Sequence, residues 1–399
     1  MSESRRSLVI FTKFYWPEGG GAELATHLIL RMISNEFEIV IISGTHPSKV
    51  RLPNPTAKYI YWGELRYNYK PTELFYVLVS NSAIRRSLET ADVVYVYSPL
   101  PLAILAKKIC PNANVIVHLH NYQPVSYTSV IFYDESISTS DIARTVRLEL
   151  FGNRKVYRAL LSSLMAYTNR INTIALHYAD NIICVSKRQA EILAERVKGV
   201  EGKIAIIYNP LPHYRKNTKA PSHKPTMLYL GGDSYTKGFN ILLNALSDLA
   251  SKPACNNLQI MCAGKFARSP LIFSFTKVVG RVSNETLYDL YSKCWGLLAP
   301  SIVEEPLPYV VVEAMAAETI PIASRVGGIP EIVQGTFAEK MLFAPGAERE
   351  FVEKVEEIQS LSKQNLIEIG VKLKNAVTKK FDDETIRTHL IKVFNESAV

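Results

Sequence analysis

The sequence predicts an α/β protein with two doubly wound, Rossmann-like domains of similar size that face a cleft. Short runs rich in β-branched residues alternate with longer helical patterns, which is typical of parallel sheets with helices on both faces. This scheme occurs twice, on either side of a segment at 210–226 that is rich in proline and basic residues and has no Asp or Glu. Such a composition is typical of a linker.

Six strands are predicted in the first half, which we expect to form one domain over 1–210. These runs are almost continuously apolar, as strands covered on both faces must be. They lie at 7–11, 37–43, 92–97, 114–120, 181–186 and 203–208. Helical patterns occupy 23–33, 72–89, 101–109 and a long stretch across 141–178.

The second half repeats the arrangement, and we expect a second domain over 211–380. Its predicted strands lie at 226–232, 258–264, 276–280, 295–300, 319–324 and 339–344. The segment 381–399 has a capping aspartate ahead of a helical pattern that places Ile386, Leu390 and Val393 on one face. We expect it to form a helix that returns to the first domain.

The chain has 46 basic and 37 acidic residues, which gives a formal charge of +9. Residues 1–208 carry most of the excess, with 24 basic and 17 acidic residues. A basic N-terminal half could bind nucleic acid, an anionic membrane or a phosphorylated substrate, or it could simply have a basic surface. Because no nucleic-acid-binding motif or aromatic-basic platform is present, we expect no nucleic-acid partner.

The five cysteines are scattered and form no C-x-x-C pair, which argues against a zinc site and indicates a reducing compartment. The first residues turn polar too soon for a signal peptide, and no stretch of about 18 apolar residues could span a membrane. We therefore expect a cytoplasmic protein. The sequence does not indicate an oligomeric state.

Two glutamates, Glu305 and Glu313, flank the predicted start of a helix. Pro308 suits the first turn, so the helix would begin at about Tyr309 and its free amides could hold an anion such as pyrophosphate. The two carboxylates could then accept hydrogen bonds from hydroxylated rings on either side of that anion. Alternatively, Glu313 is a solvated helix residue and Glu305 is part of an acidic turn.

Lys237 follows a predicted strand and the turn Gly231–Gly232, and it precedes a helix. Open α/β sheets place phosphates at such a position, although an exposed turn lysine is the alternative. The run Gly19–Gly21 likewise follows a strand and opens a helix, so this loop could approach a ligand closely or be only a flexible turn. It does not match G-x-G-x-x-G, which argues against a dinucleotide site.

His118 and His120 alternate at the end of a predicted strand, so they share one face. His120 lies nearer the carboxyl end, where ligands sit in open sheets. The pair could instead bind a metal ion, but no third ligand is near in sequence. We expect His118 to be a structural histidine.

Five segments together resemble the glycosyltransferase family 4 group, whose members have the GT-B fold. The fullest match is APSIVEEPLPYVVVEAMAAETIPIASRVGGIPEIV at 299–333, which is similar to the family block that contains the paired glutamates. The others follow the family order and are spread along the chain: WPEGGGAELATHLILRMI (16–33), ADNIICVSKRQAEIL (179–193), IIYNP (206–210) and GGDSYTKGFNILLNAL (231–246).

The resemblance implies a retaining glycosyltransferase, a hexosyltransferase that moves a sugar from a nucleotide-diphosphate sugar to a hydroxyl acceptor. The acceptor would be a glycan, a lipid-linked sugar or a polysaccharide precursor. Because no D-x-D pair sits in a suitable loop, we expect no metal ion, and no cofactor besides the donor substrate. A GT-B-like nucleotide-sugar epimerase and a non-catalytic nucleotide-sugar-binding relative remain as alternatives.

The resemblance also implies roles for single residues. Glu305 would hold hydroxyls of the donor sugar, Glu313 the ribose, and Lys237 the diphosphate. Val282 would approach the base, and His120 would lie near the transferred sugar. The implied catalytic residues are His120, Lys237 and Glu305, and the implied donor-binding residues are Gly20, Gly21, Gly231, Gly232, Lys237, Val282, Glu305, Leu307, Pro308, Tyr309 and Glu313.

The chain departs from the family pattern at three positions. Gly232 stands where the family often has an arginine, and Lys265 or Arg268 could supply that charge instead. Pro308 and Glu318 each replace a usual glycine, and Pro308 has no backbone N–H to donate.

A basic, apolar helical segment at 143–161 is relevant to where the acceptor substrate is located. It mixes Arg144, Arg147, Arg154, Lys155 and Arg158 with Val146, Leu148, Leu150, Phe151 and Leu160. Such a helix could rest on an anionic membrane at its cytoplasmic face and reach a lipid-linked acceptor, or it could pack on the sheet as a solvated amphipathic helix.

Overall fold

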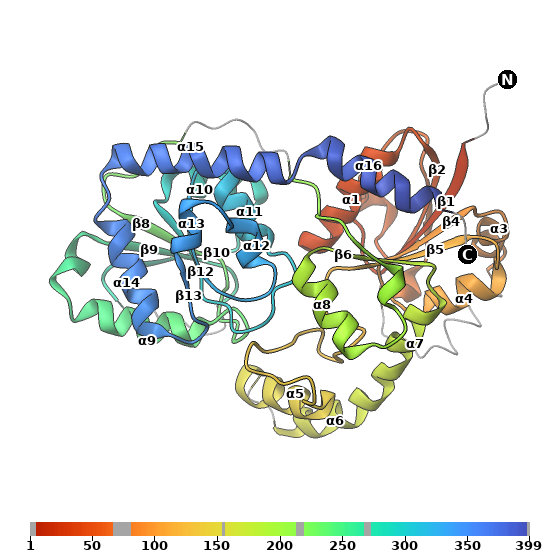
Figure 1. Cartoon of the computed structure of the whole chain (residues 1–399), viewed down its shortest axis with the longest axis horizontal. Coiled ribbons are helices and arrows are strands. Elements are labelled where there is room, and N and C mark those ends of the chain that lie inside the picture. Colours follow the sequence, from red (N-terminus) through yellow and green to blue (C-terminus); the bar gives the residue numbers. More distant parts are fainter. Residues whose placement is uncertain (1–4, 67–80, 154–155, 213–218, 267–272, 397–399) are drawn as a thin grey trace.

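The computed structural model describes residues 5–66, 81–153, 156–212, 219–266 and 273–396. It contains two parallel sheets, each flanked by helices, in two domains that lie side by side (Figure 1). The predicted fold class is confirmed.

The first sheet has seven strands in the order β3-β2-β1-β4-β5-β6-β7, all parallel. Its strands are β1 (Arg6–Thr12), β2 (Phe37–Ser43), β3 (Lys58–Tyr61), β4 (Val93–Val96), β5 (Asn114–Leu119), β6 (Asn181–Cys184) and β7 (Ile204–Ile206). The central strands β4 and β5 are buried throughout, as their apolar runs predict. β3 was not predicted, because this edge strand has exposed polar ends and only half-buried residues between them.

The helices of the first domain include α1 (Gly21–Ile33), α3 (Ser82–Glu89), α4 (Leu102–Ile109), α5 (Asp141–Arg147), α6 (Val156–Ala166), α7 (Arg170–Tyr178) and α8 (Lys187–Arg196). Much of the helix predicted at 72–89 lies outside the described residues. The single long helix predicted across 141–178 is wrong. A π-helical turn at Leu148–Asn153 and a 3-10 turn at Tyr167–Asn169 divide it, and both turns end in residues of low helix propensity.

The second sheet has six parallel strands in the order β10-β9-β8-β11-β12-β13. They are β8 (Thr226–Tyr229), β9 (Gln259–Ala263), β10 (Thr276–Gly280), β11 (Gly296–Ala299), β12 (Ile320–Ser324) and β13 (Leu342–Phe343). The helices here are α9 (Phe239–Ala250), α10 (Asn284–Lys293), α11 (Tyr309–Ala316), α12 (Ile329–Val333), α13 (Phe337–Lys340), α14 (Glu348–Gln359) and α15 (Lys363–Lys380).

Both sheets have the same topological switch point. β1 lies between β2 and β4, and β8 lies between β9 and β11, so the strand order reverses beside each domain's first strand. Open α/β sheets bind ligands outside the carboxyl ends of the strands at such a point. The loops after β1, β4, β8 and β11 are therefore where a site is expected.

The last helix, α16 (Asp383–Asn395), returns to the first domain as predicted (Figure 1). Its apolar residues Ile386, Leu390 and Val393 are buried. The side-chain amide of Asn114 in β5 donates to the carbonyl of Val393 at 2.9 Å. This crossing ties the two domains together next to the start of the linker, where the ring of Phe381 lies 5.1 Å from that of Tyr208.

Lys219 anchors the described part of the linker to the second domain. Its buried ammonium donates to the carbonyls of Tyr291 (3.1 Å) and Cys294 (2.6 Å) and to the hydroxyl of Thr319 (2.7 Å). Burial lowers the pKa of Lys219 from 10.5 to about 7. At neutral to mildly alkaline pH, unfolding therefore takes up a proton, and this residue makes the protein more stable as the pH rises.

We expect Lys219→Met to remove this pH dependence. Relative to the variant, the wild type should gain free energy of unfolding as the pH rises from about 7 to about 9, by at most about 1.4 kcal/mol per pH unit. Urea unfolding of both proteins at each pH measures the difference. Parallel pH profiles would contradict it.

Candidate active site

A small cavity of about 40 Å³ opens at the switch point of the second sheet. The loops that follow β8 and β11 supply most of its charged and polar lining, together with the start of α11. The lining residues are Tyr229, Leu230, Gly231, Lys237, Leu297, Leu298, Ala299, Ser301, Glu305, Pro308, Val310 and Ile329. The structure therefore brings four of the predicted residues together here: Gly231, Lys237, Glu305 and Pro308.

Lys237 and Glu305 form an ion pair in this cavity. The ammonium of Lys237 lies 2.6 Å from Oε1 of Glu305, and the hydroxyl of Ser301 donates to the same oxygen at 2.9 Å. The side chain of Glu305 is only 10% exposed, whereas that of Lys237 is 43% exposed. The site thus has a fixed acceptor in its wall and a cation that solvent or a ligand can reach.

Gly238 sets the position of Lys237. It precedes α9 with φ of 72°, and a Cβ there would overlap the carbonyl of Pro300 at the end of β11. Only glycine adopts this conformation readily and leaves room for such a close approach. The loops after β8 and β11 are therefore packed backbone against backbone beside the ion pair.

Two glycines hold the segment that carries Glu305. The amide of Gly328 donates to the carbonyl of Glu305 at 2.8 Å, and the amide of Gly327 donates to the carboxylate of Glu304 at 2.5 Å. A Cβ on Gly327 would overlap the backbone of Glu305, and one on Gly328 would overlap the carbonyl of Pro306. This glycine pair lies in the segment that resembles the family but was not predicted to have a role, and Ser301 was not predicted either.

α11 begins at Tyr309, as predicted, although Pro308 is its N-cap and does not lie within its first turn. Glu313 is buried on this helix, and its carboxylate accepts a hydrogen bond from the hydroxyl of Tyr291 at 3.3 Å. Glu313 is thus neither exposed nor among the described residues that line the cavity. Leu307 is buried, and the lining likewise does not include Val282, in the loop after β10.

The absence of the family's arginine at position 232 has a steric reason. Gly232 has φ of 57°, and a Cβ there would lie 2.5 Å from the carbonyl oxygen of Lys265. The backbone of the 264–266 loop thus occupies the space where a side chain at position 232 would begin. Lys265 is exposed beside this turn, and Arg268 lies outside the described residues.

The glycine loop of the first domain faces the start of α11. A Cβ on Gly21 would lie 3.0 Å from the ring of Tyr309, and the hydroxyl of Tyr309 donates to the carbonyl of Pro210 at 2.9 Å. Next to it, the amide of Gly20 donates to the carboxylate of Glu23 at 2.7 Å. The two domains therefore meet where the helix amides begin.

The two histidines pack against each other at the end of β5. Nδ1 of His118 lies 2.6 Å from the hydroxyl of Tyr95, and the rings of His118 and His120 lie 4.2 Å apart. Burial lowers the pKa of His120 to about 3, so this ring is neutral at physiological pH. His118 is buried as expected, but among the described residues Nε2 of neither ring has a hydrogen-bond partner.

Tyr97 joins His120 to the glycine loop. Its ring meets that of His120 edge to face at 4.9 Å, and its hydroxyl donates to Oε1 of Glu23 at 3.3 Å. Loops after β1, β4 and β5 are thereby connected. Tyr97 and Glu23 were not predicted as site residues, because nothing in their local sequence sets them apart from other helix and strand residues.

Glu331 links the domains on another side of the site. Its carboxylate accepts from the backbone amides of Lys187 (3.1 Å) and Arg188 (3.3 Å), at the start of α8, and from the hydroxyl of Tyr208 (3.0 Å). Arg188 also pairs with Glu304 at 3.2 Å. A carboxylate at a helix N-terminus is favourable, so this contact stabilises the observed arrangement of the domains.

A second interdomain contact adjoins the loops that line the cavity. Phe132 forms a β-bridge with Val303, and the amide of Glu304 donates to the carbonyl of Ile131 at 2.8 Å. The ring of Tyr235 lies 6.0 Å from that of Phe132. Since Tyr235 and Val303 each precede a residue of the ion pair by two positions, a first-domain segment contacts both loops of the cavity.

The described part of the chain has neither a metal-binding cluster nor a membrane-spanning helix. No group of three or more His, Cys, Asp or Glu side chains is arranged to hold a metal ion. No described helix is both long enough and apolar enough to cross a membrane.

Comparison with known proteins identifies the class. The family described as Glycosyltransferase Family 4 matches residues 18–215, and the family described as Glycosyl transferases group 1 matches residues 212–372. These matches meet at the linker and together span both domains. The chain belongs to the family 4 group of glycosyltransferases.

Relatives are distant. Two uncharacterized glycosyltransferases of Methanocaldococcus jannaschii are 27% and 31% identical over 176 and 172 residues. The matches cover 38% and 41% of this chain, and they span less than half of these relatives' length, 44% and 46%.

Solved structures share the fold over nearly the whole chain. Sucrose-phosphate synthase of Thermosynechococcus elongatus has a TM-score of 0.71 at 18% identity, with 98% of each chain covered. The HepE protein of Anabaena, in a complex with UDP-glucose, has a TM-score of 0.63 at 15% identity, with 97% of this chain and 98% of that chain covered. The fold is therefore GT-B.

Proposed function

We propose that this protein transfers a sugar, with retention of configuration, from a nucleotide-diphosphate sugar to a hydroxyl acceptor. The observation that carries the proposal is the Lys237–Glu305 pair in a cavity at the switch point of the second sheet. A cation beside the start of a helix suits a diphosphate, and a buried carboxylate suits sugar hydroxyls. The UDP-glucose complex of the Anabaena neighbour supports a UDP-sugar as the first donor to test.

In this proposal Lys237 and the first amides of α11 stabilise the diphosphate as it leaves. Such preorganised charge is effective because it needs no rearrangement during the reaction. The bond from the anomeric carbon to the diphosphate oxygen breaks, and the acceptor oxygen bonds to that carbon on the same face. The acceptor proton passes to the departing phosphate oxygen, and no divalent metal is required.

The first-domain residues complete the site. His120, neutral and next to Tyr97, would lie near the transferred sugar, and the loop at Gly20–Gly21 would face the diphosphate and the acceptor. The proposed acceptor is a glycan, a lipid-linked sugar or a polysaccharide precursor, and the proposed setting is the cytoplasmic face of an anionic membrane.

A thermal-shift screen against UDP-, GDP- and ADP-sugars tests the donor, because a ligand that binds the folded state raises its melting temperature. NMR of the product then reports its anomeric configuration. An inverted product, or a product formed without acceptor, would overturn the proposal.

Lys237→Met should weaken donor binding about 10- to 100-fold, because a charge-assisted hydrogen bond to the diphosphate is lost. Titration calorimetry with the donor found in the screen measures this. Lys374→Met is the matched control, since Lys374 pairs with Glu318 at 2.7 Å and is also 43% exposed. Equal donor affinity in both variants would show that Lys237 does not bind the donor.

A further inference from the structure

The segment between β5 and β6 forms a lobe of α5, the π-helical turn and α6 that projects from the first domain (Figure 1). On α6 the large apolar side chains point outward. Val156, Leu160 and Leu164 are 74%, 67% and 69% exposed, and Ala159 and Ala166 are the buried residues. The outer face, which we call the α6 face, consists of Val156, Tyr157, Leu160, Leu161, Leu164 and Met165.

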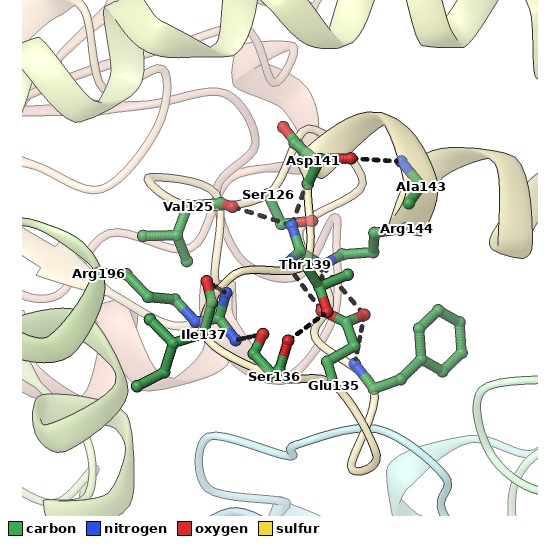
Figure 2. A network of polar contacts seen from close by, with 12 residues as sticks. Val125, Ser126, Glu135, Ser136, Ile137, Thr139, Asp141, Ala143, Arg144 and Arg196 are labelled. Atoms are coloured by element: carbon green, nitrogen blue, oxygen red, sulfur yellow. Dashed lines mark hydrogen bonds and ion pairs between the residues drawn. The ribbon is translucent and has the colours of Figure 1, made fainter.

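The lobe is firmly built. The guanidinium of Arg144, on α5, is buried and binds the carboxylates of Glu135 (2.7 Å) and Asp141 (3.1 Å), as Figure 2 shows. Arg196 of α8 donates to the carbonyls of Ser136 and Ile137 and so ties the same loop to the domain (Figure 2). The part of the lobe that precedes α6 is therefore anchored to the first domain.

The residues around this face are predominantly basic, although the carboxylate of Glu149 pairs with Arg158 at 3.5 Å. Residues 150–179 contain no Asp or Glu, and they contain Arg158 and Arg170 as well as Arg154 and Lys155, which lie outside the described residues. Arg170 lies over the ring of Tyr167 at 4.5 Å, just beyond the end of α6. Tyr157 and Tyr167 thus place exposed aromatic rings near both ends of the face, where interfacial aromatics are favourable.

We propose that the α6 face docks on an anionic lipid bilayer, with α6 lying in the plane of the interface. A contiguous apolar patch with a basic rim is the surface that interfacial helices present to such membranes. A second copy of the chain suits this face less well, because a symmetric contact would bring two net positive rims together, and the nearby Glu149 already pairs with Arg158. The inference deepens the membrane setting of the proposed function and does not depend on the chemistry of transfer.

Docking here would bring the site to the membrane surface. The π-helical turn that precedes α6 contacts the second domain through Phe151, whose ring stacks with that of Tyr235 at 6.2 Å. The lobe therefore lies beside the loop that carries Lys237. An acceptor with a lipid tail in the bilayer fits this placement better than a freely diffusing one.

Co-sedimentation of the full chain with phosphatidylcholine vesicles, with and without phosphatidylglycerol, tests the inference. We expect binding to the phosphatidylglycerol vesicles at low salt and about tenfold weaker binding, or more, for Leu160→Asn/Leu164→Asn. Arg170→Gln should weaken it about fivefold. The control Ile367→Asn/Val371→Asn alters two exposed apolar residues four apart on α15 and should bind like the wild type.

Two results would overturn the inference. One is wild-type protein that stays in the supernatant with anionic vesicles at low salt. The other is sedimentation velocity that shows a dimer converted to monomer by Leu160→Asn/Leu164→Asn, which would make a second copy the occupant. The thermal shift with nucleotide sugar should be the same in this variant and the wild type, so a failure of docking is distinguishable from a failure of the donor site.

Discussion

Glu305→Gln should lower turnover about 100- to 1,000-fold and leave the protein folded. Glutamine keeps the size of the side chain but removes its negative charge. The carboxylate of Glu305 pairs with the ammonium of Lys237 and accepts a hydrogen bond from the hydroxyl of Ser301. A neutral acceptor holds sugar hydroxyls less strongly, and the loss grows in the transition state as charge develops. Initial rates at saturating donor measure the effect.

A matched pair elsewhere in the chain supplies the control. The carboxylate of Glu318 pairs with the ammonium of Lys374 at 2.7 Å. Their side chains are 12% and 43% exposed, close to the 10% and 43% of Glu305 and Lys237. Glu318→Gln should therefore retain nearly full activity. Both variants should melt within about 3 °C of the wild type, because a partly exposed ion pair contributes little to stability. Similar rates for the two variants would show that Glu305 has no special role.

Much of the fold can be predicted because its strands are buried on both faces. β2 was predicted with its observed bounds, and β1 to within one residue at each end, since these strands are apolar runs between turns. β3 lacks that signal because it lies at the edge of its sheet. The helical pattern at 141–178 has a helical period throughout, so the periodicity did not show that Gly152 and Asn169 lie in turns that divide it.

The site residues also fall into those that the sequence predicts and those that it does not. Lys237 and Glu305 stand out because each follows a strand at the switch point and lies in a family motif. Glu331 contacts residues that are far away in sequence. Ser301 contacts Glu305 through a turn whose shape the sequence does not specify. Glu313 has a motif signal too, but its burial against Tyr291 depends on how α11 packs.

Gly327→Ala should destabilise the protein by about 3 kcal/mol or more and abolish most activity. The residue has φ of 53°, which an alanine adopts at a cost of about 1–2 kcal/mol. In addition, the new Cβ would overlap the backbone of Glu305, so the segment that carries this carboxylate must move. For a domain of this size the melting temperature should fall by about 6–12 °C.

Gly335→Ala separates the two causes. Gly335 also has a positive φ, 76°, but a Cβ there meets nothing within 4 Å. This variant should lose only the conformational contribution of about 1–2 kcal/mol, with a fall in melting temperature of about 2–8 °C and full activity. Because both changes add one methyl group to a left-handed glycine, the difference between them measures how tightly Gly327 holds Glu305. Equal melting temperatures and equal rates would mean that the 304–306 segment can shift without consequence, and the glycine pair would then not position the carboxylate.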